Sequence, residues 1–189
     1  MAQEEAPLAL TLRAAAFAAR VHSTHRRKGA AAEPYVNHVL EVAEILAAQD
    51  APLAAIVAGL LHDTVEDSDA DPEPVTLARI EAEFGAEVAG IVAEVSDDKS
   101  LPKEVRKGLQ VRHAAKASAA AKQVKLADKI SNLRTIVASP PAGWGHARRL
   151  EYVGWAGRVA AGAKGVNPRL DALFEATYRE AVTRLAAED

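Results

Sequence analysis

The stretch Leu53-Ala-Ala-Ile-Val-Ala-Gly-Leu-Leu-His-Asp63 decides the fold of this chain. Its first nine residues are the densest apolar run in the sequence, and Pro52 opens the run. A proline at the start of such a run is typical of a helix, so the stretch predicts a buried helix. Spanning a bilayer takes ~18 apolar residues, which this run does not approach, so we expect no membrane segment.

Helical periodicity continues on both sides of this run, and no convincing strand pattern interrupts it. Thr76 and Asn167 are expected to cap helices, and Pro168 suits a first helical turn. Loops are predicted at residues 29–34, 63–74, 96–98 and 140–143. The first predicted helix covers residues 7–19, where Leu8, Leu12, Ala15 and Ala19 lie at helical spacing. Further helices are predicted at residues 39–46, 53–61, 77–84, 88–95, 102–117 and 120–137. Of the last two predicted helices, one contains Tyr152 and Trp155 and the other follows Asn167. We therefore predict an all-α fold with one domain over residues 1–189.

The composition limits the kinds of site that the chain can build. Apolar residues make up 49% of it and aromatic residues only 4%, so alanine-rich helices should pack closely. There is no cysteine, which excludes disulfides and thiolate metal ligands. Residues 1–7 lack the pattern of a signal peptide, so the cytoplasm is the expected location. The sequence allows a homo-oligomer but does not indicate one.

The charge pattern favours a small anionic partner over a long one. The net charge of -3 argues against binding to nucleic acid, which usually requires a strongly basic face. Two basic clusters stand out, at residues 25–28 and at residues 99–107. They suit a compact polyanion, although solvated charged faces are the more ordinary explanation on composition alone.

Three places in the sequence, which together hold four residues, suggest a metal site. His62 and Asp63 end the apolar run, and an ion between them needs further ligands from other helices. His38 begins a helix after a proline-containing loop, and Asp128 lies among apolar positions of a long helix. A carboxylate there is costly unless it is paired with a cation or a metal. A salt bridge from Asp128 to a neighbouring lysine, Lys125 or Lys129, is the alternative.

The order of these residues resembles the H…HD…D pattern of the HD superfamily of metal phosphohydrolases. The segments around Arg27-Lys28, Pro34–His38, Leu60–Asp67 and Val124–Thr135 are similar to the hydrolase domain of RelA/SpoT homologues. Glu94–Lys103 and the stretch from Gly143-Trp144 to Tyr152 look most like the stand-alone Mesh1-type small alarmone hydrolases. The resemblance covers roughly residues 8–180 and implies an HD-type bundle of about eight to ten helices.

The resemblance also implies the chemistry of the site. One Mn²⁺ ion would be held by two histidines and two aspartates, namely His38, His62, Asp63 and Asp128, although other divalent metals are not excluded by the ligand types. Glu66 and Asp67 match an acidic pair that orients or deprotonates the attacking water. Asn132 matches a pocket asparagine of the catalytic site.

The implied substrate is a small phosphorylated nucleotide. The family removes the 3′-diphosphate of guanosine tetra- or pentaphosphate, ppGpp or pppGpp. The expected substrate contacts are Arg27, Lys28, Tyr35, Lys99, Lys103, Thr135, Arg148 and Tyr152. The loop at residues 29–33 is apolar where relatives often carry more polar residues, so adenine alarmones remain an alternative. The resemblance to Mesh1-type proteins keeps the 2′-phosphate of NADPH as another. A nucleotide sensor without turnover and a purely structural bundle are the alternatives of another class.

Overall fold

The computed structural model describes residues 6–29, 31–68 and 73–188. Within these residues the chain forms nine α-helices and no β-strand, which confirms the all-α prediction. In chain order the helices are α1 (Pro7–Val21), α2 (Val36–Ala48), α3 (Leu53–Leu61), α4 (Leu77–Phe84), α5 (Ala86–Val95), α6 (Lys103–Ala114), α7 (Ala119–Ala138), α8 (His146–Ala163) and α9 (Pro168–Ala186).

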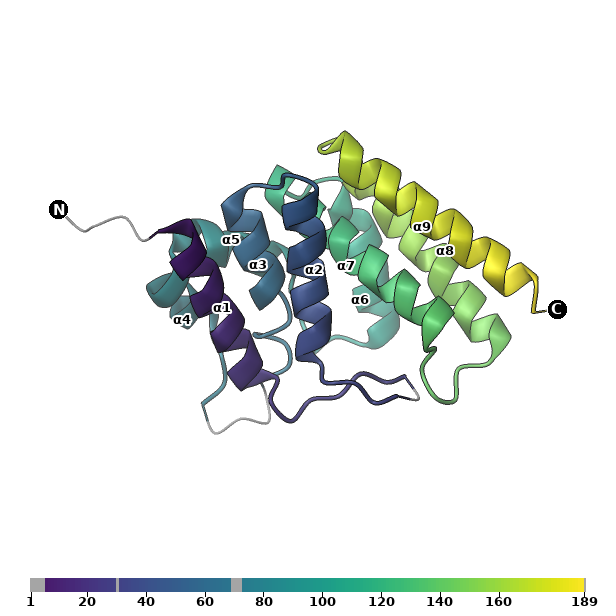
Figure 1. Ribbon diagram of the computed structural model, residues 1–189, viewed down its shortest axis with the longest axis horizontal. Coiled ribbons are helices and arrows are strands. Elements are labelled where there is room, and N and C mark those ends of the chain that lie inside the picture. The colour runs from purple at the N-terminus through teal and green to yellow at the C-terminus, as the bar shows by residue number, and fades with distance from the viewer. Residues whose placement is uncertain (1–5, 30, 69–72, 189) are drawn as a thin grey trace.

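The apolar run forms α3, and this helix packs against α1, α2, α5 and α7 (Figure 1). Six of its nine residues are buried, including Leu60 and Leu61 at its end. Gly59 allows α2 to approach closely, because a Cβ atom at this position would lie 2.7 Å from the Leu46 side chain. His62 directly follows the helix, so the buried environment of α3 extends to the first candidate ligand.

Helix α7 is the longest helix, and it carries the predicted site residues Asp128, Asn132 and Thr135. It packs against α2, α3, α5, α8 and α9. Ser118 caps its start by accepting a hydrogen bond from the Ala121 N–H. Because neighbours surround α7 on so many sides, polar residues in its middle are held between packed helices.

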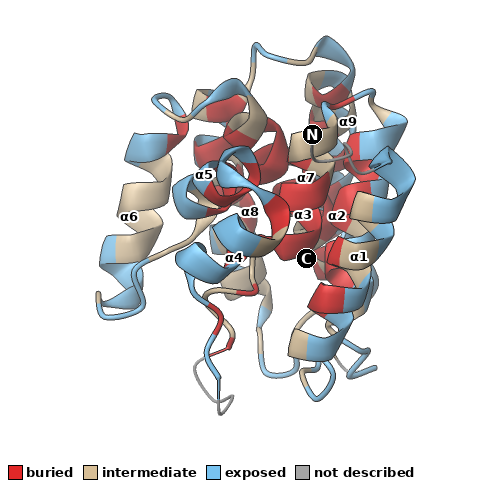
Figure 2. Ribbon diagram, turned by 90° about the vertical axis from the view of Figure 1, so that its left-hand side faces the viewer, coloured by how far each residue is buried: buried red, intermediate tan, exposed pale blue. Residues whose placement is uncertain are grey.

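Helix α6 stands apart from this core. Its main packing partner is α8, through a small separate apolar cluster of Ala114, Trp155 and Val159. Figure 2 shows α6 at the side of the molecule, mostly intermediate or exposed, whereas α3 and α7 are largely buried. Helix α6 corresponds to the helix predicted at residues 102–117.

The leucines whose spacing predicted α1 do not lie on its buried face. Leu8 and Leu12 are 70% and 60% exposed. The buried face instead holds Phe17, whose ring meets Phe84 edge-on at 5.4 Å between centroids. The largest aromatic side chain therefore sets the orientation of the helix, since its burial removes the most apolar surface from water.

Helix ends follow the predicted signals. The Thr76 side chain accepts a hydrogen bond from Arg79, and the Asn167 side chain accepts hydrogen bonds from the next turn of α9. Of the predicted loop at 63–74, residues 62–67 form turns and a bend, while residues 69–72 lie outside the described residues.

Among the helices that the structure describes, none has the length and apolar character needed to cross a membrane.

Candidate metal centre and anion pocket

The two histidines of the candidate centre are oriented by hydrogen bonds on their far sides. Ser131 donates its hydroxyl proton to Glu41 (2.6 Å), so its oxygen accepts from Nδ1 of His38 (2.8 Å). Nδ1 of His62 donates to the Gly59 carbonyl oxygen (2.7 Å). With the proton on Nδ1 in each ring, Nε2 is left with a free lone pair, the form in which imidazole binds a metal.

Both Nε2 atoms face two carboxylates. Nε2 of His62 lies 3.0 Å from Asp63 Oδ2 and 3.9 Å from Asp128 Oδ1. Nε2 of His38 lies 3.3 Å from Asp128 Oδ1 and 3.8 Å from Asp63 Oδ2. One ligand atom each from His38, His62 and Asp128 lies within 4.8 Å of the other two.

A divalent cation fits this donor set. Nε2 of His62 is buried, and although Asp63 Oδ2 lies 3.0 Å away, no described residue meets the geometry of a hydrogen bond to it, so the position favours a bound cation. Imidazoles in their neutral form and carboxylates are common ligands of divalent metals. The residues present therefore match a metal site formed by His38, His62 and Asp128, with Asp63 beside it.

The carboxylates are themselves held in place. Asp63 Oδ2 accepts a hydrogen bond from the Tyr35 hydroxyl (2.6 Å). Asp128 Oδ1 accepts from the Asn132 amide (2.5 Å), and its other oxygen pairs with Lys129 Nζ (2.7 Å). The salt bridge considered as an alternative for Asp128 therefore exists with Lys129, and the candidate metal ligands lie beside it.

The pKa shifts of these groups indicate that the cluster favours the binding of a positive charge. Burial opposes the charged form of Asp63 and of Asp128. Nevertheless, His62 lowers the pKa of Asp63, and Lys129 lowers the pKa of Asp128 well below its usual range. Burial also disfavours charged His62, but Asp63 and Asp128 raise its pKa to about 9. The buried carboxylates thus stay ionised and attract a cation.

Two more acids lie one turn beyond the ligands. The Glu66 carboxylate accepts a hydrogen bond from the backbone N–H of Asp97 (2.7 Å). Lys99 donates to the Glu66 carbonyl and to Asp67 Oδ1 (2.7 Å for the second contact). Burial raises the pKa of Glu66 to about 7, with nearby Asp63 and Asp97 adding to the shift. A carboxylate with this pKa can take up and release a proton near neutral pH.

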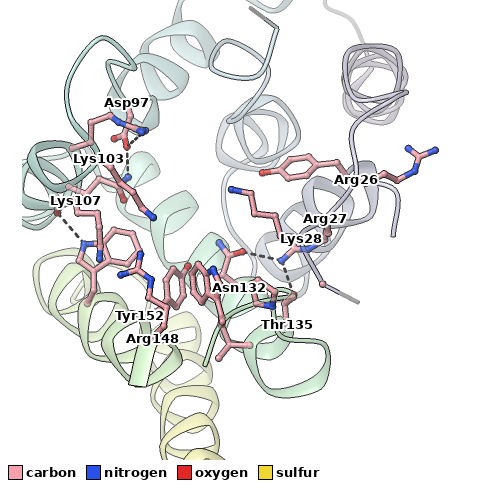
Figure 3. Close-up of a pocket in the computed structure, with 18 residues that line it drawn as sticks. Arg26, Arg27, Lys28, Asp97, Lys103, Lys107, Asn132, Thr135, Arg148 and Tyr152 are labelled. Carbon is pink, nitrogen blue, oxygen red and sulfur yellow. Dashed lines mark hydrogen bonds and ion pairs between the residues drawn. The ribbon is translucent and has the colours of Figure 1, made fainter. Parts of the chain in front are cut away.

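A pocket of about 450 Å³ opens beside the centre (Figure 3). Tyr35 and Asn132 belong both to its wall and to the surroundings of the metal ligands, so the two sites are continuous. Seven cationic side chains line the pocket, and they are Arg26, Arg27, Lys28, Lys103, Arg106, Lys107 and Arg148. Such a wall favours a ligand with several negative charges.

The cations come from two sides of the pocket. Figure 3 shows Arg27 and Lys28 on one side and Lys103, Lys107 and Arg148 on the other. Arg27 donates to the Asn132 side chain (3.1 Å) and to the Thr135 hydroxyl (2.7 Å). These contacts fix the guanidinium against α7, close to Asp128.

An aromatic wall completes the pocket. The Tyr152 ring lies 5.7 Å from that of Trp144 and 5.3 Å from that of Trp155, between ring centroids. Arg148 covers the Trp144 ring at 5.1 Å. A pocket with both cations and aromatic rings offers contacts to phosphates and to a planar base.

Most of the residues predicted to bind the substrate do line this pocket. They are Arg27, Lys28, Tyr35, Lys103, Thr135, Arg148 and Tyr152, together with Asn132. Lys99 is not among the lining residues and contacts Glu66 and Asp67 instead. The residues in the middle of α6 were missed, although Arg106, Lys107 and Gln110 follow Lys103 at helical spacing on one face.

Gly29 joins the two segments that form the pocket rim. It forms an isolated bridge with Pro141, and the Ala142 N–H donates to the Lys28 carbonyl (2.8 Å). A Cβ atom at Gly29 would lie 2.6 Å from the Ser139 carbonyl oxygen. The backbone there has no room for a side chain.

We expect Gly29→Ala to lower the free energy of unfolding by about 1–3 kcal/mol, the usual cost of overpacking. Chemical denaturation measures this change. Gly90→Ala in α5 is the matched control, because a Cβ atom there meets nothing within 4 Å. Equal stability of both variants would contradict the tight rim contact.

Comparisons with known proteins agree with this geometry. A protein-family profile described as HD domain matches residues 14–153, which include all four candidate metal ligands. The human protein named guanosine-3′,5′-bis(diphosphate) 3′-pyrophosphohydrolase MESH1 is 46% identical over 172 residues, covering 89% of this chain and 93% of the human one. The protein of the same name from Drosophila melanogaster is 43% identical over 166 residues, covering 87% and 90% of the two chains.

A solved structure also matches the fold. It is described as a metazoan orthologue of SpoT that hydrolyses ppGpp and plays a role in starvation responses. The TM-score is 0.85 at 40% sequence identity, and the match covers 95% of this chain and 98% of the other. The similarity therefore extends through α8 and α9 as well as the ligand-bearing helices.

Proposed function

Because the chain belongs to the HD-domain family and, within it, to the MESH1-type pyrophosphohydrolases, we propose that it removes the 3′-diphosphate of ppGpp and pppGpp. The products are pyrophosphate and GDP or GTP. The observation that carries the proposal is the junction of the cluster of His38, His62 and Asp128, with Asp63 beside it, with a pocket lined by seven cations. Such a pocket suits a nucleotide with two diphosphate groups.

Mn²⁺ is the proposed ion, held by His38, His62, Asp63 and Asp128. Two nitrogen and two oxygen ligands suit Mn²⁺, and the same set also accepts other divalent metals. A bound divalent cation lowers the pKa of a water molecule and polarises a phosphoryl oxygen. A direct test is metal analysis of the purified protein, followed by activity with each divalent metal added back.

The side chains near the cluster supply proton transfer and substrate positioning. Glu66 accepts the proton of the attacking water, whose oxygen bonds to the phosphorus attached to the ribose O3′. The bond from that phosphorus to O3′ breaks, and O3′ takes up a proton as pyrophosphate leaves. Arg27 and the α6 cations hold the phosphates in line, since phosphoryl transfer depends mainly on positioning and neutralised charge. Tyr152 and Trp144 provide the surface for ribose and base.

Lys103 gives the clearest test of phosphate binding. It has no ion pair or hydrogen bond with another described residue. Desolvation and the nearby cations Arg148 and Lys107 lower its pKa, because these ammonium and guanidinium groups repel one another. An anionic ligand between them would relieve this repulsion.

We expect Lys103→Ala to raise KM for ppGpp by about tenfold while kcat changes little, since one charge-assisted contact is lost. The effect should shrink at high salt, where exposed charges are screened. Lys116→Ala, an exposed lysine beyond the end of α6, is the matched control. An unchanged KM would remove Lys103 from the substrate site.

The identity of the nucleotide is tested by product analysis with ppGpp, ppApp and NADPH. Pyrophosphate release from ppGpp with the highest kcat/KM supports the proposal. A preference for ppApp or release of phosphate from NADPH would keep the metal chemistry and change the substrate. Binding of all three without any product would favour a nucleotide sensor.

Two further expectations belong to the same proposal. The cytoplasm is the proposed place of action, because the substrates derive from the cellular pool of guanine nucleotides, and cell fractionation tests it. A homo-oligomer is allowed by the sequence, and light scattering of the purified protein tests whether one forms.

A further inference from the structure

The segment Asp97–Leu101, between α5 and α6, contacts both acids that follow the metal ligands. Its Asp97 N–H donates to the Glu66 carboxylate (2.7 Å), and its Lys99 ammonium contacts the Glu66 carbonyl and Asp67. Glu66 comes from the turns after α3, so a separate part of the chain determines where its carboxylate lies.

The same segment is tied to the substrate pocket through its first side chain. Asp97 Oδ2 accepts a hydrogen bond from Gln110 (2.8 Å) and lies 3.7 Å from a guanidinium nitrogen of Arg106. Arg106 also donates to the Leu101 carbonyl (3.3 Å). All of these α6 contacts lie on the pocket wall, and Figure 3 shows Asp97 on the side where Lys103 lies.

The charge of Asp97 opposes its surroundings. It is the only acidic residue among the described residues that line the pocket, and its side chain is 14% exposed. A carboxylate in this place weakens the binding of a polyanion, because it neutralises part of the cationic wall. Any role of Asp97 in the reaction is therefore something other than an increase in the affinity for phosphate.

We propose that Asp97 is a positioning residue, whose anchored side chain holds its backbone N–H against Glu66 and so fixes the acid that accepts the proton of water. This inference rests on the proposed hydrolase function. Helix α6 is the anchor: Gln110 and Arg106 fix the Asp97 carboxylate, and the rigid peptide transmits that position to Glu66. A displacement of about 1 Å at a reacting group can cost about a hundredfold in rate.

The inference predicts an unusual split between the two kinetic constants. Asp97→Ala should lower kcat for ppGpp by about tenfold to a hundredfold. Its KM should stay equal or fall, because the pocket loses a negative charge and Arg106 becomes free for the substrate. A variant that merely damaged the pocket would raise KM instead.

The conservative variant separates positioning from charge. Asp97→Asn keeps an oxygen that can accept the Gln110 hydrogen bond, so it should recover most of the kcat lost in Asp97→Ala. Gln110→Ala should lower kcat in the same direction. Adding Gln110→Ala to Asp97→Ala should lower kcat little further, because both changes remove the same contact.

The experiment measures kcat and KM for pyrophosphate release from ppGpp by the full chain carrying its metal. Asp98→Asn is the control, since it removes a charge from the next residue, which is exposed and away from the pocket. Thermal unfolding and metal content of each variant show whether the fold and the centre are intact. Wild-type kcat in folded Asp97→Ala, or an equal loss of kcat in Asp98→Asn, would overturn the inference. If the wild-type chain itself releases no pyrophosphate, the proposed function fails before Asp97 is tested.

Discussion

Replacing Asp63 by asparagine should abolish turnover and strongly weaken metal binding. The amide keeps an oxygen that can accept the Tyr35 hydrogen bond, so the local fold should survive. It removes the negative charge that faces Nε2 of both histidines. A catalytic metal stabilises the transition state by several kcal/mol, so activity should fall by at least about a thousandfold.

Metal content by mass spectrometry and the rate of pyrophosphate release are measured on the same preparation. Asp50→Asn is the matched control. Asp50 is 78% exposed, and its side chain pairs with Arg169 rather than with a residue of the cluster. The control should keep both metal and activity. A folded Asp63→Asn protein with wild-type metal content and turnover would contradict the four-ligand centre.

Replacing Glu66 by glutamine should lower kcat by about a hundredfold to ten-thousandfold, the usual contribution of a general base. Glutamine can still accept the Asp97 hydrogen bond but cannot take a proton from water. KM and metal content should stay within about twofold of wild type, because Glu66 is neither a metal ligand nor a pocket-lining residue. Steady-state kinetics beside Glu44→Gln, an exposed acid on α2, measure the difference.

The pH profile gives this prediction a second readout. Burial raises the pKa of Glu66 to about 7, and below its pKa the protonated acid cannot accept another proton. Wild-type kcat/KM should therefore decrease as the pH falls through a pKa at or below about 7, since a bound cation lowers that value. The residual activity of Glu66→Gln should lack this limb. An unchanged limb in the variant would assign it to another group.

Periodicity and capping residues were enough to predict the helices. The apolar run indicated that His62 follows a buried helix, and the spacing of Asp128, Asn132 and Thr135 indicated that they share one face of a second helix. The expected convergence of His38, His62, Asp63 and Asp128, however, came from the resemblance to a family, since spacing alone cannot bring α2, α3 and α7 together. The leucine spacing indicated that α1 is a helix but did not indicate its buried face, which holds Phe17.

Other features of the site have no signal in a single sequence. The contact from the Asp97 N–H to Glu66 is made by the backbone, and backbone contacts leave no trace in side-chain type. Lys99 was expected at the substrate by resemblance to the family, and its ammonium contacts Asp67. Arg106 and Gln110 could have been found, because they share a helical face with Lys103.

The most direct test of the central claim is chromatographic separation of the products of ppGpp after the protein has been chelated and then reconstituted with Mn²⁺. The account predicts GDP and pyrophosphate in equal amounts from the reconstituted protein and neither product from the chelated one. Product formation that chelation does not affect, or no GDP from a fully reconstituted protein, would contradict it.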